Sequence, residues 1–236
     1  MKKLFTAVLL MVICASSVFA QRLGGSYASR RIETYDNYYG FRIGYNAASL
    51  RFSEGDAVDP SSVSAMNFGL VAGYGLGDTD LIFEPGVLYS VKGGKTKSKA
   101  QVKTMIFMHD IEVPFVLKYN LELPSGNAAL QPFFGGYLNM GIAGKTKVEF
   151  GNTVTLDRQK VKTFTSKRFH RLDAGLRFGC GLNIDFFYVE AAYDLGLVDL
   201  GRNTDKFQSL FPGAYDGGWD DKVRTGCLSI SLGVNF

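Results

Sequence analysis

The feature of this sequence that most limits its fold is a two-residue periodicity of apolar side chains, which recurs in eight segments. In each segment, apolar residues alternate with glycine, polar or charged residues. Successive side chains of a strand point to opposite faces, so this period predicts strands with one apolar and one polar face. No stretch has a helical period of comparable strength. The segments are 39–47, 66–74, 81–91, 107–119, 130–142, 172–184, 187–197 and 228–236.

The connections between these segments fall into a short class and a long class. Tight turns are expected at residues 77–79, at 124–127 and around Asp185. The remaining connections, 53–63, 92–104, 144–167 and 199–223, are long and polar. Short turns at one end and long loops at the other are typical of outer-membrane barrels, whereas a soluble sandwich has no reason to sort its connections in this way. The pattern predicts an all-β, antiparallel, up-and-down transmembrane β-barrel of about eight strands.

The polar faces of the segments carry charges of both signs. A soluble barrel such as a lipocalin keeps its apolar residues inside, and a membrane barrel has the reverse arrangement. Because an eight-stranded barrel is narrow enough for side chains to fill it, we expect these charges to form a mutually neutralising interior of salt bridges and hydrogen bonds. The expected interior network consists of Arg42, Glu84, Asp110, Glu112, Lys118, Asp173, Arg177, Glu190 and Asp194.

The first twenty residues have the pattern of a secretory signal peptide. Two lysines precede an apolar run to about Ala15, and residues 18–20 (VFA) offer a cleavage site. The run is shorter than the roughly 20 apolar residues that a spanning helix needs. Cys14 raises the alternative of a lipoprotein, but residues 11–13 (MVI) lack the small residue that such processing usually requires. We expect a signal peptide at 1–20, a polar lead-in at 21–38 and a barrel at 39–236, exported through the periplasm to the outer membrane.

The last segment and the cysteines add two expectations. The segment LSISLGVNF ends in Phe236, and an alternating strand that ends in an aromatic residue is what outer-membrane barrels present to their insertion machinery. Cys180 and Cys227 fall on non-adjacent segments and on opposite faces. We therefore expect two free thiols, although an exported protein can form disulfides.

Three stretches of the sequence resemble the PorT-like outer-membrane β-barrel family of Gram-negative bacteria. They are LIFEPGVLYSVKGGK (81–95), with a Lys-Gly loop at its end, HDIEVPFVLKYNL (109–121) and AAYDLGLVDL (191–200). The resemblance spans about residues 39–236. It implies an eight-stranded membrane barrel of the small OmpA/OmpX type and, for the family's namesake, a part in protein secretion. Motifs on barrel strands support a fold more directly than a function.

Two histidines raise the question of catalysis. Some small outer-membrane barrels modify lipid A with a histidine near the outer leaflet, but no serine lies two residues from His109 or His170. Asp110 is expected on the opposite face from His109, so we expect polar interfacial roles and no enzyme. The sequence shows no metal cluster, phosphate-binding glycine loop or nucleophile constellation, so neither a metal nor another cofactor is expected. The net charge of +4, without a basic helix, gives no reason to expect a nucleic-acid partner.

The long connections contain two candidate contact surfaces. The 92–104 and 144–167 loops are basic, beginning with Lys92, and their lysines either pair with lipopolysaccharide phosphates or serve only solubility. The aromatic residues of the 199–223 loop either bind a protein or glycan partner, or cover the barrel mouth or the bilayer interface. The candidate lipopolysaccharide contacts are Lys95, Lys97, Lys99, Lys160 and Lys162, the candidate loop surface is Phe207, Phe211, Tyr215 and Trp219, and the expected aromatic girdle is Tyr45, Tyr74, Tyr89 and Tyr119.

These features favour a non-enzymatic outer-membrane barrel that acts through its long extracellular loops, in a structural, adhesion or secretion-accessory role. The expected partners are outer-membrane lipid, lipopolysaccharide and the barrel-insertion machinery. A pore or transporter for small solutes is the first alternative, against which a packed charged interior argues. A lipid A-modifying enzyme is the second.

Overall fold

The computed structural model describes residues 37–52, 58–77, 79–98, 103–124, 128–150, 157–162, 170–201 and 222–236. The expected signal peptide and nearly all of the lead-in lie outside the described residues, as do Lys99 and the four loop aromatics at 207, 211, 215 and 219. In the described ranges, no helix is long and apolar enough to cross a membrane.

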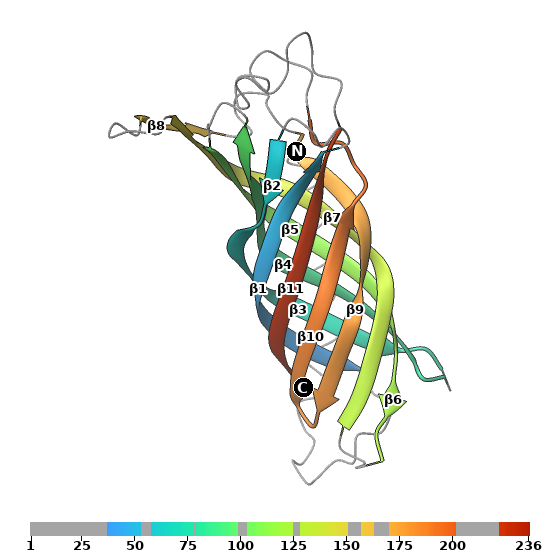
Figure 1. The fold of residues 1–236 in the computed structure, drawn as a ribbon. Coiled ribbons are helices and arrows are strands. Elements are labelled where there is room, and N and C mark those ends of the chain that lie inside the picture. The colour runs from blue at the N-terminus through green and yellow to red at the C-terminus, as the bar shows by residue number, and fades with distance from the viewer. Residues whose placement is uncertain are drawn as a thin grey trace. The chain divides into compact units, whose positions relative to one another are not determined.

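Eight long strands form a closed antiparallel barrel, as the periodicity predicts (Figure 1). Each strand pairs with its neighbour in the chain, and the first long strand also pairs with the last, which closes the ring. Short strands β2 (Val58–Ser61), β6 (Leu121–Glu122) and β8 (Asp157–Lys162) pair with β4, β7 and β7 respectively. The barrel strands are β1 (Tyr38–Phe52), β3 (Val63–Gly75), β4 (Leu81–Ser98), β5 (Lys103–Tyr119), β7 (Ala128–Phe150), β9 (Leu172–Ile184), β10 (Phe187–Gly196) and β11 (Val223–Asn235).

The two faces of the barrel wall have opposite character. Large apolar side chains cover the outside, and Leu70 (65%), Phe134 (59%) and Leu232 (58%) are among the most exposed. The charged and polar side chains of the same strands are buried inside. In water such an outer surface would be an aggregation hazard, whereas in a bilayer it is the face that lipid covers. The alternation therefore has the orientation of a membrane barrel and not of a lipocalin.

One end of the barrel, the turn end, carries the short connections. The β3–β4 turn contains Gly77 at φ 63°, and the β9–β10 turn is Asp185–Phe186, with Asp185 at φ 53°. Glycine and aspartate are among the residues that tolerate this left-handed conformation, so both positions suit their residues. The backbone groups of Tyr39 and Phe236 bond each other at 3.1 and 2.8 Å at this same end.

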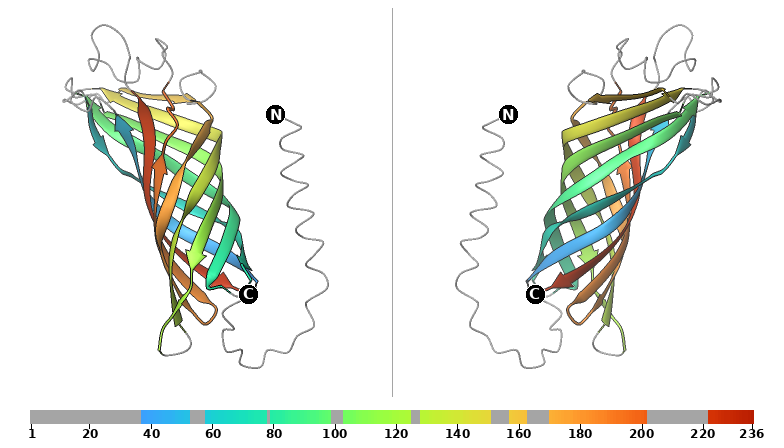
Figure 2. Two further views of the ribbon diagram at one scale, coloured as in Figure 1. Left: turned by 90° about the vertical axis from the view of Figure 1, so that its right-hand side faces the viewer. Right: turned by 90° about the vertical axis from the view of Figure 1, so that its left-hand side faces the viewer.

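At the opposite end, the loop end, several strands run further than the sequence predicts. β4 continues to Ser98 and β5 begins at Lys103, so most of the expected 92–104 loop, including its Lys-Gly stretch, is strand. β7 continues to Phe150 and pairs there with β8, within the expected 144–167 loop (Figure 2). The prediction was wrong because, beyond the bilayer, neither face of a strand has to be apolar. The period-two signal therefore fades while the backbone ladder continues.

A β-bulge in β7 reverses the faces of its outer segment. His109 of β5 pairs with Ala143 and Asp110 pairs with Gly141, so Ile142 is the extra residue. Before the bulge the odd-numbered residues of β7 are the buried ones, as at Asn139, and after it the even-numbered Thr146 is buried. The bulge thereby leaves Lys145 on the outer face of the strand.

Candidate functional site

All nine residues of the expected interior network are buried in the structure. A tenth charged residue, Lys92, is 1% exposed and lies among them, although the sequence predicts it in a loop. This prediction was wrong because the alternating apolar residues end at Val91, whereas the strand continues to Ser98. Lys92 is an even number of residues from Glu84 on the same strand, so both side chains point to the same face. This spacing could have identified Lys92 as an interior residue.

The interior nearest the turn end holds what we call the turn-end cluster, organised around Glu84. Glu84 Oε2 accepts from Arg42 Nη2 at 3.2 Å, from Lys118 Nζ at 2.8 Å and from the Tyr38 hydroxyl. The Tyr188 ring lies 4.1 Å from both the Arg42 guanidinium carbon and Lys118 Nζ. Lys118 Nζ also donates to the Tyr188 hydroxyl at 2.6 Å. Two cations therefore share one carboxylate and one aromatic ring.

The central cluster, which comprises Lys92, Glu112, Arg177, Glu190 and Asp194, has two cations for three acids. Arg177 contacts Glu112 at 2.8 Å, Asp194 at 3.1 Å and Glu190 at 3.2 Å. Lys92 Nζ lies 2.7 Å from Glu112 Oε2 and 2.8 Å from Asp194 Oδ2. Lys92–Glu112 joins the neighbouring strands β4 and β5, and Arg177 contacts Glu190 and Asp194 on the neighbouring strand β10. Lys92–Asp194 and Arg177–Glu112 join strands that do not pair with each other. Each charge of the central cluster thus has a partner of opposite sign, as burial requires.

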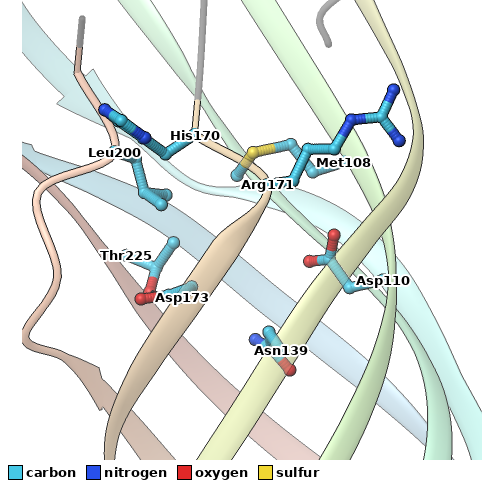
Figure 3. A pocket seen from close by; sticks show the side chains of 8 residues that line it. All are labelled: Met108, Asp110, Asn139, His170, Arg171, Asp173, Leu200 and Thr225. Atoms are coloured by element: carbon cyan, nitrogen blue, oxygen red, sulfur yellow. The ribbon is translucent and has the colours of Figure 1, made fainter. Parts of the chain in front are cut away.

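Toward the loop end, the interior contains a small hollow, the outer hollow, with space for roughly one water molecule. Figure 3 shows Asp110 and Asp173 on facing walls of it, with Asn139 below them. In the orientation that satisfies its neighbours, the Asn139 amide donates to Glu112 and accepts from Lys92, both at 3.2 Å. Asn139 therefore joins the outer hollow to the central cluster. The residues lining the hollow are Met108, Asp110, Asn139, His170, Arg171, Asp173, Leu200 and Thr225.

The two carboxylates of the outer hollow lack the ion pairs that the other interior acids make. Asp173 Oδ2 accepts from Thr225 Oγ1 at 2.7 Å and from the Tyr137 hydroxyl at 3.4 Å, while its Oδ1 has no partner in the described ranges. Neither Asp110 nor Asp173 forms a salt bridge to a described residue. Among the buried charged residues of the described interior, these two acids are thus the ones without an ion pair. Arg171, which also lines the hollow, is exposed and donates to the Gly141 carbonyl oxygen at 3.3 Å.

The histidines lie in different surroundings. His109 Nδ1 is 2.5 Å from the Tyr89 hydroxyl, and the Tyr89 ring also packs against Phe68 at 5.1 Å. This row lies on the outer face of the barrel, so Asp110 and His109 are on opposite faces, as expected. His170 is exposed and lies beside the outer hollow. The other three expected girdle tyrosines, Tyr45, Tyr74 and Tyr119, are exposed. The Tyr45 hydroxyl shares a hydrogen bond of 2.7 Å with the Ser64 hydroxyl.

The basic residues of the second and third expected loops lie on adjacent strands of the loop-end extension. The pairing register aligns Lys95 with Met105, Met105 with Lys147, and Lys147 with Lys160. Lys145 pairs with Lys162 in the next row, and Lys97 pairs with Lys103. Lys95 and Lys145 are exposed, and Lys147 Nζ lies 5.8 Å from the Phe107 ring. Residues that are separate in the sequence are therefore side by side on β4, β5, β7 and β8.

The two cysteines of the barrel are both free. Cys227 of β11 is buried inside, and Cys180 of β9 is half-buried on the other face, with β10 between the two strands. The expected separation of these thiols is confirmed.

The sequence matches the model of a family described as "Outer membrane protein beta-barrel domain" over residues 19–201. The chain belongs to this family. It is accordingly a protein of the outer membrane, as the loop pattern and the outward apolar face predict. The finer resemblance to the PorT-like group stays a prediction. No curated protein matches the chain.

Several solved structures of bacterial outer-membrane proteins are similar to this one. Neisserial surface protein A has 16% sequence identity and a TM-score of 0.42, over 84% of this chain and 97% of that chain. Ail, the attachment invasion locus protein of Yersinia pestis, has 14% identity and a TM-score of 0.39, over 85% and 99%. OprG from Pseudomonas aeruginosa has 14% identity and a TM-score of 0.44, over 86% and 97%.

Proposed function

We propose that this protein is a non-conducting, non-enzymatic barrel that acts at the extracellular surface, in a structural, adhesion or secretion-accessory role. In outer-membrane barrels the short turns lie in the periplasm and the longer connections lie outside the cell. The loop end, with its extended strands, is therefore the extracellular end. The observation that carries the proposal is the filled interior, which leaves the extracellular end as the part available for contacts.

The interior argues against a solute path because its charges are paired across the lumen. Lys92 bridges β4 to Glu112 of β5 and Asp194 of β10, and Arg177 links the same two acids from β9. A permeating ion would have to separate pairs that are 5% exposed or less, at a desolvation cost of several kcal/mol per ion. Below them, the Tyr188 ring between Arg42 and Lys118 occupies a further level of the lumen.

Planar-bilayer recording of the refolded protein tests this occlusion, with a general porin recorded in parallel as the positive control. We expect no discrete conductance. A matched variant in which residues 202–221 are replaced by a short glycine-serine linker should also show no discrete conductance. The reason is that the side chains inside the barrel, and not the fourth loop, close the lumen. Openings in both forms would support the pore alternative and contradict the proposal, and openings in the variant alone would assign the closure to the loop.

The extended basic strands supply a contact surface for the proposed role. Exposed Lys95 and Lys145, together with Lys147, lie where β4, β5 and β7 pass beyond the apolar belt. The register adds positions 160 and 162 of β8 to the same rows. Phosphate groups of lipopolysaccharide are dense at this level of the outer leaflet, and lysine pairs well with phosphate. We propose that these lysines anchor the extension to lipopolysaccharide, while the aromatics of the fourth loop stay the predicted contact for a protein or glycan.

Binding of refolded protein to lipid A, compared with lipid A lacking its phosphates, tests the anchoring. Lys95→Gln should weaken binding and reduce its salt dependence, and a triple Lys95→Gln, Lys145→Gln, Lys147→Gln variant should weaken it further. Lys222→Gln, at an exposed lysine outside the extension, is the matched control and should bind like the unmodified protein. Equal loss in Lys222→Gln, or no preference for the phosphates, would reduce the lysines to a solubility role.

A further inference from the structure

We propose that Asp110 and Asp173 form a binding site for a hard divalent cation, of the Ca²⁺ or Mg²⁺ class, in the outer hollow. Asp110 is 5% exposed and Asp173 is 6% exposed, and both line the hollow. Figure 3 shows Asp110 of β5 and Asp173 of β9 among the side chains that line the hollow, with the Asp173 carboxyl group beside Thr225. The proposal concerns the interior and is independent of the lysines and of the question of conductance.

The first argument is that oxygen atoms with unused hydrogen-bonding capacity face this space. Asp110 makes neither a hydrogen bond nor an ion pair with any residue in the described part of the chain, although it is almost fully buried. Asp173 uses Oδ2 with Thr225 and Tyr137, and its Oδ1 is buried without a described partner. Buried carboxylate oxygens are nearly always satisfied by a donor or a cation, so the enclosed Asp173 Oδ1 indicates a ligand, and Asp110 on the same hollow is the second candidate to bind it.

The second argument is charge. The fully buried residues of the described interior include six acids but only four bases. The four bases already contact Glu84, Glu112, Glu190 and Asp194, so the surplus of two negative charges falls on the outer hollow. Two carboxylates that face one another repel unless positive charge lies between them. One divalent cation would balance this surplus.

The third argument concerns which cation fits. Among the described residues, no group of three acidic, histidine or cysteine side chains has metal-binding geometry. The hollow instead offers two carboxylates, with the Thr225 hydroxyl beside them and room for roughly one water molecule. A site that supplies few, oxygen-only ligands suits a hard cation that keeps part of its water shell, as Mg²⁺ and Ca²⁺ do, and does not suit zinc.

Terbium luminescence tests the site directly, because Tb³⁺ replaces Ca²⁺ and emits when a nearby tyrosine is excited. The Tyr137 hydroxyl lies 3.4 Å from Asp173 Oδ2, so an ion held there has a built-in sensitiser. Detergent-refolded, lipopolysaccharide-free protein should show saturable emission that Ca²⁺ or Mg²⁺ displaces, and the more effective competitor identifies the cation. Tyr137→Phe should lower the emission of the bound ion.

Isosteric variants identify the ligands. Asp110→Asn and Asp173→Asn should each weaken Tb³⁺ binding by at least about tenfold, a loss that even changes beyond the direct ligands can produce. The double variant should show no saturable emission. Asp185→Asn, at the opposite end of the barrel, makes the same charge change at a position where asparagine tolerates the observed φ of 53°, and should bind normally.

Thermal unfolding provides a second readout that does not use Tb³⁺. We expect CaCl₂ or MgCl₂ to raise the melting temperature of the unmodified protein relative to EDTA, and to leave that of the Asp110→Asn, Asp173→Asn double variant unchanged. The proposal is overturned if the unmodified protein shows neither saturable emission nor a cation-dependent melting temperature. Emission and a melting shift that both survive in the double variant would equally overturn it.

Discussion

Asp110 and Glu112 are two residues apart on the same face of β5, yet their surroundings are opposite. Glu112 contacts both Lys92 and Arg177, whereas Asp110 contacts no cation in the described part of the chain. The same contrast separates Arg177 and Asp173 on β9. All four residues are buried on the inner face of their strands, so the difference comes from which charged side chains of the other strands lie within reach. Pairing inside this barrel is therefore a property of the register and not of the local sequence.

The comparison predicts that breaking the central cluster costs most. Arg177→Met leaves Glu112 and Asp194 to share Lys92 and removes the ion pair of Glu190. Removal of one member of a buried ion pair typically costs about 3–5 kcal/mol, and we expect a loss of this size in the free energy of unfolding of the refolded protein. Urea titration followed by heat-modifiable gel migration measures it. Lys95→Met removes a cation at an exposed position and should cost well under about 1 kcal/mol.

Removal of an acid from the same cluster should be nearly as costly. Glu112→Leu deprives both Lys92 and Arg177 of their shortest contact, so the melting temperature should fall by several degrees or more. Glu122→Leu, at an exposed site in β6, is the control for the change of side chain. An unaltered melting temperature in Glu112→Leu would mean that water solvates the cluster, as in a channel, and the contrast with the outer hollow would disappear.

The turn-end cluster should respond less, because its aromatic ring stays in place when only a hydroxyl is removed. Tyr188→Phe removes the acceptor for Lys118 Nζ at 2.6 Å, and Lys118 retains Glu84. We expect a loss of about 1–2 kcal/mol in unfolding free energy. Tyr193→Phe on the same strand is the matched control. A loss as large as that of Arg177→Met would show that the two clusters act as one network, which a double-mutant cycle would measure.

The smallest effect is expected at the outer hollow. Thr225→Val removes the 2.7 Å hydrogen bond to Asp173 and keeps the shape of the side chain, so about 1 kcal/mol or less should be lost. Ile230→Leu, on the lipid-facing side of the same strand, is the reference for a neutral change. A loss at Thr225 that matches the loss at Glu112 would indicate that Asp173 is held in the central cluster after all.

The membrane explains how much of this structure the sequence predicts. Within the apolar belt, each outward residue contacts lipid and each inward residue faces the lumen. The residue types of Phe41, Arg42 and Ile43 therefore suffice to predict which face of the strand each side chain lies on. Beyond the belt no lipid contacts the strand, so the outward residues need not be apolar. The sequence therefore predicts loops where the outer segments of β4 and β7 are strand. The interior residues were identifiable one by one, but their partners were not. Lys92 and Asp194 are 102 residues apart, and only the closure of the barrel brings them together.

The extra residue at Ile142 has a consequence for how this surface could change during evolution. A single deletion there would restore an unbroken alternation in β7 while Lys145 and Lys147 stayed outside and Thr146 stayed inside. The bulge thus absorbs one extra residue without exchanging the two faces of the outer segment. Gain or loss of one codon at this position could change the length of the strand while the charge displayed at the cell surface and the apolar belt below it stayed the same.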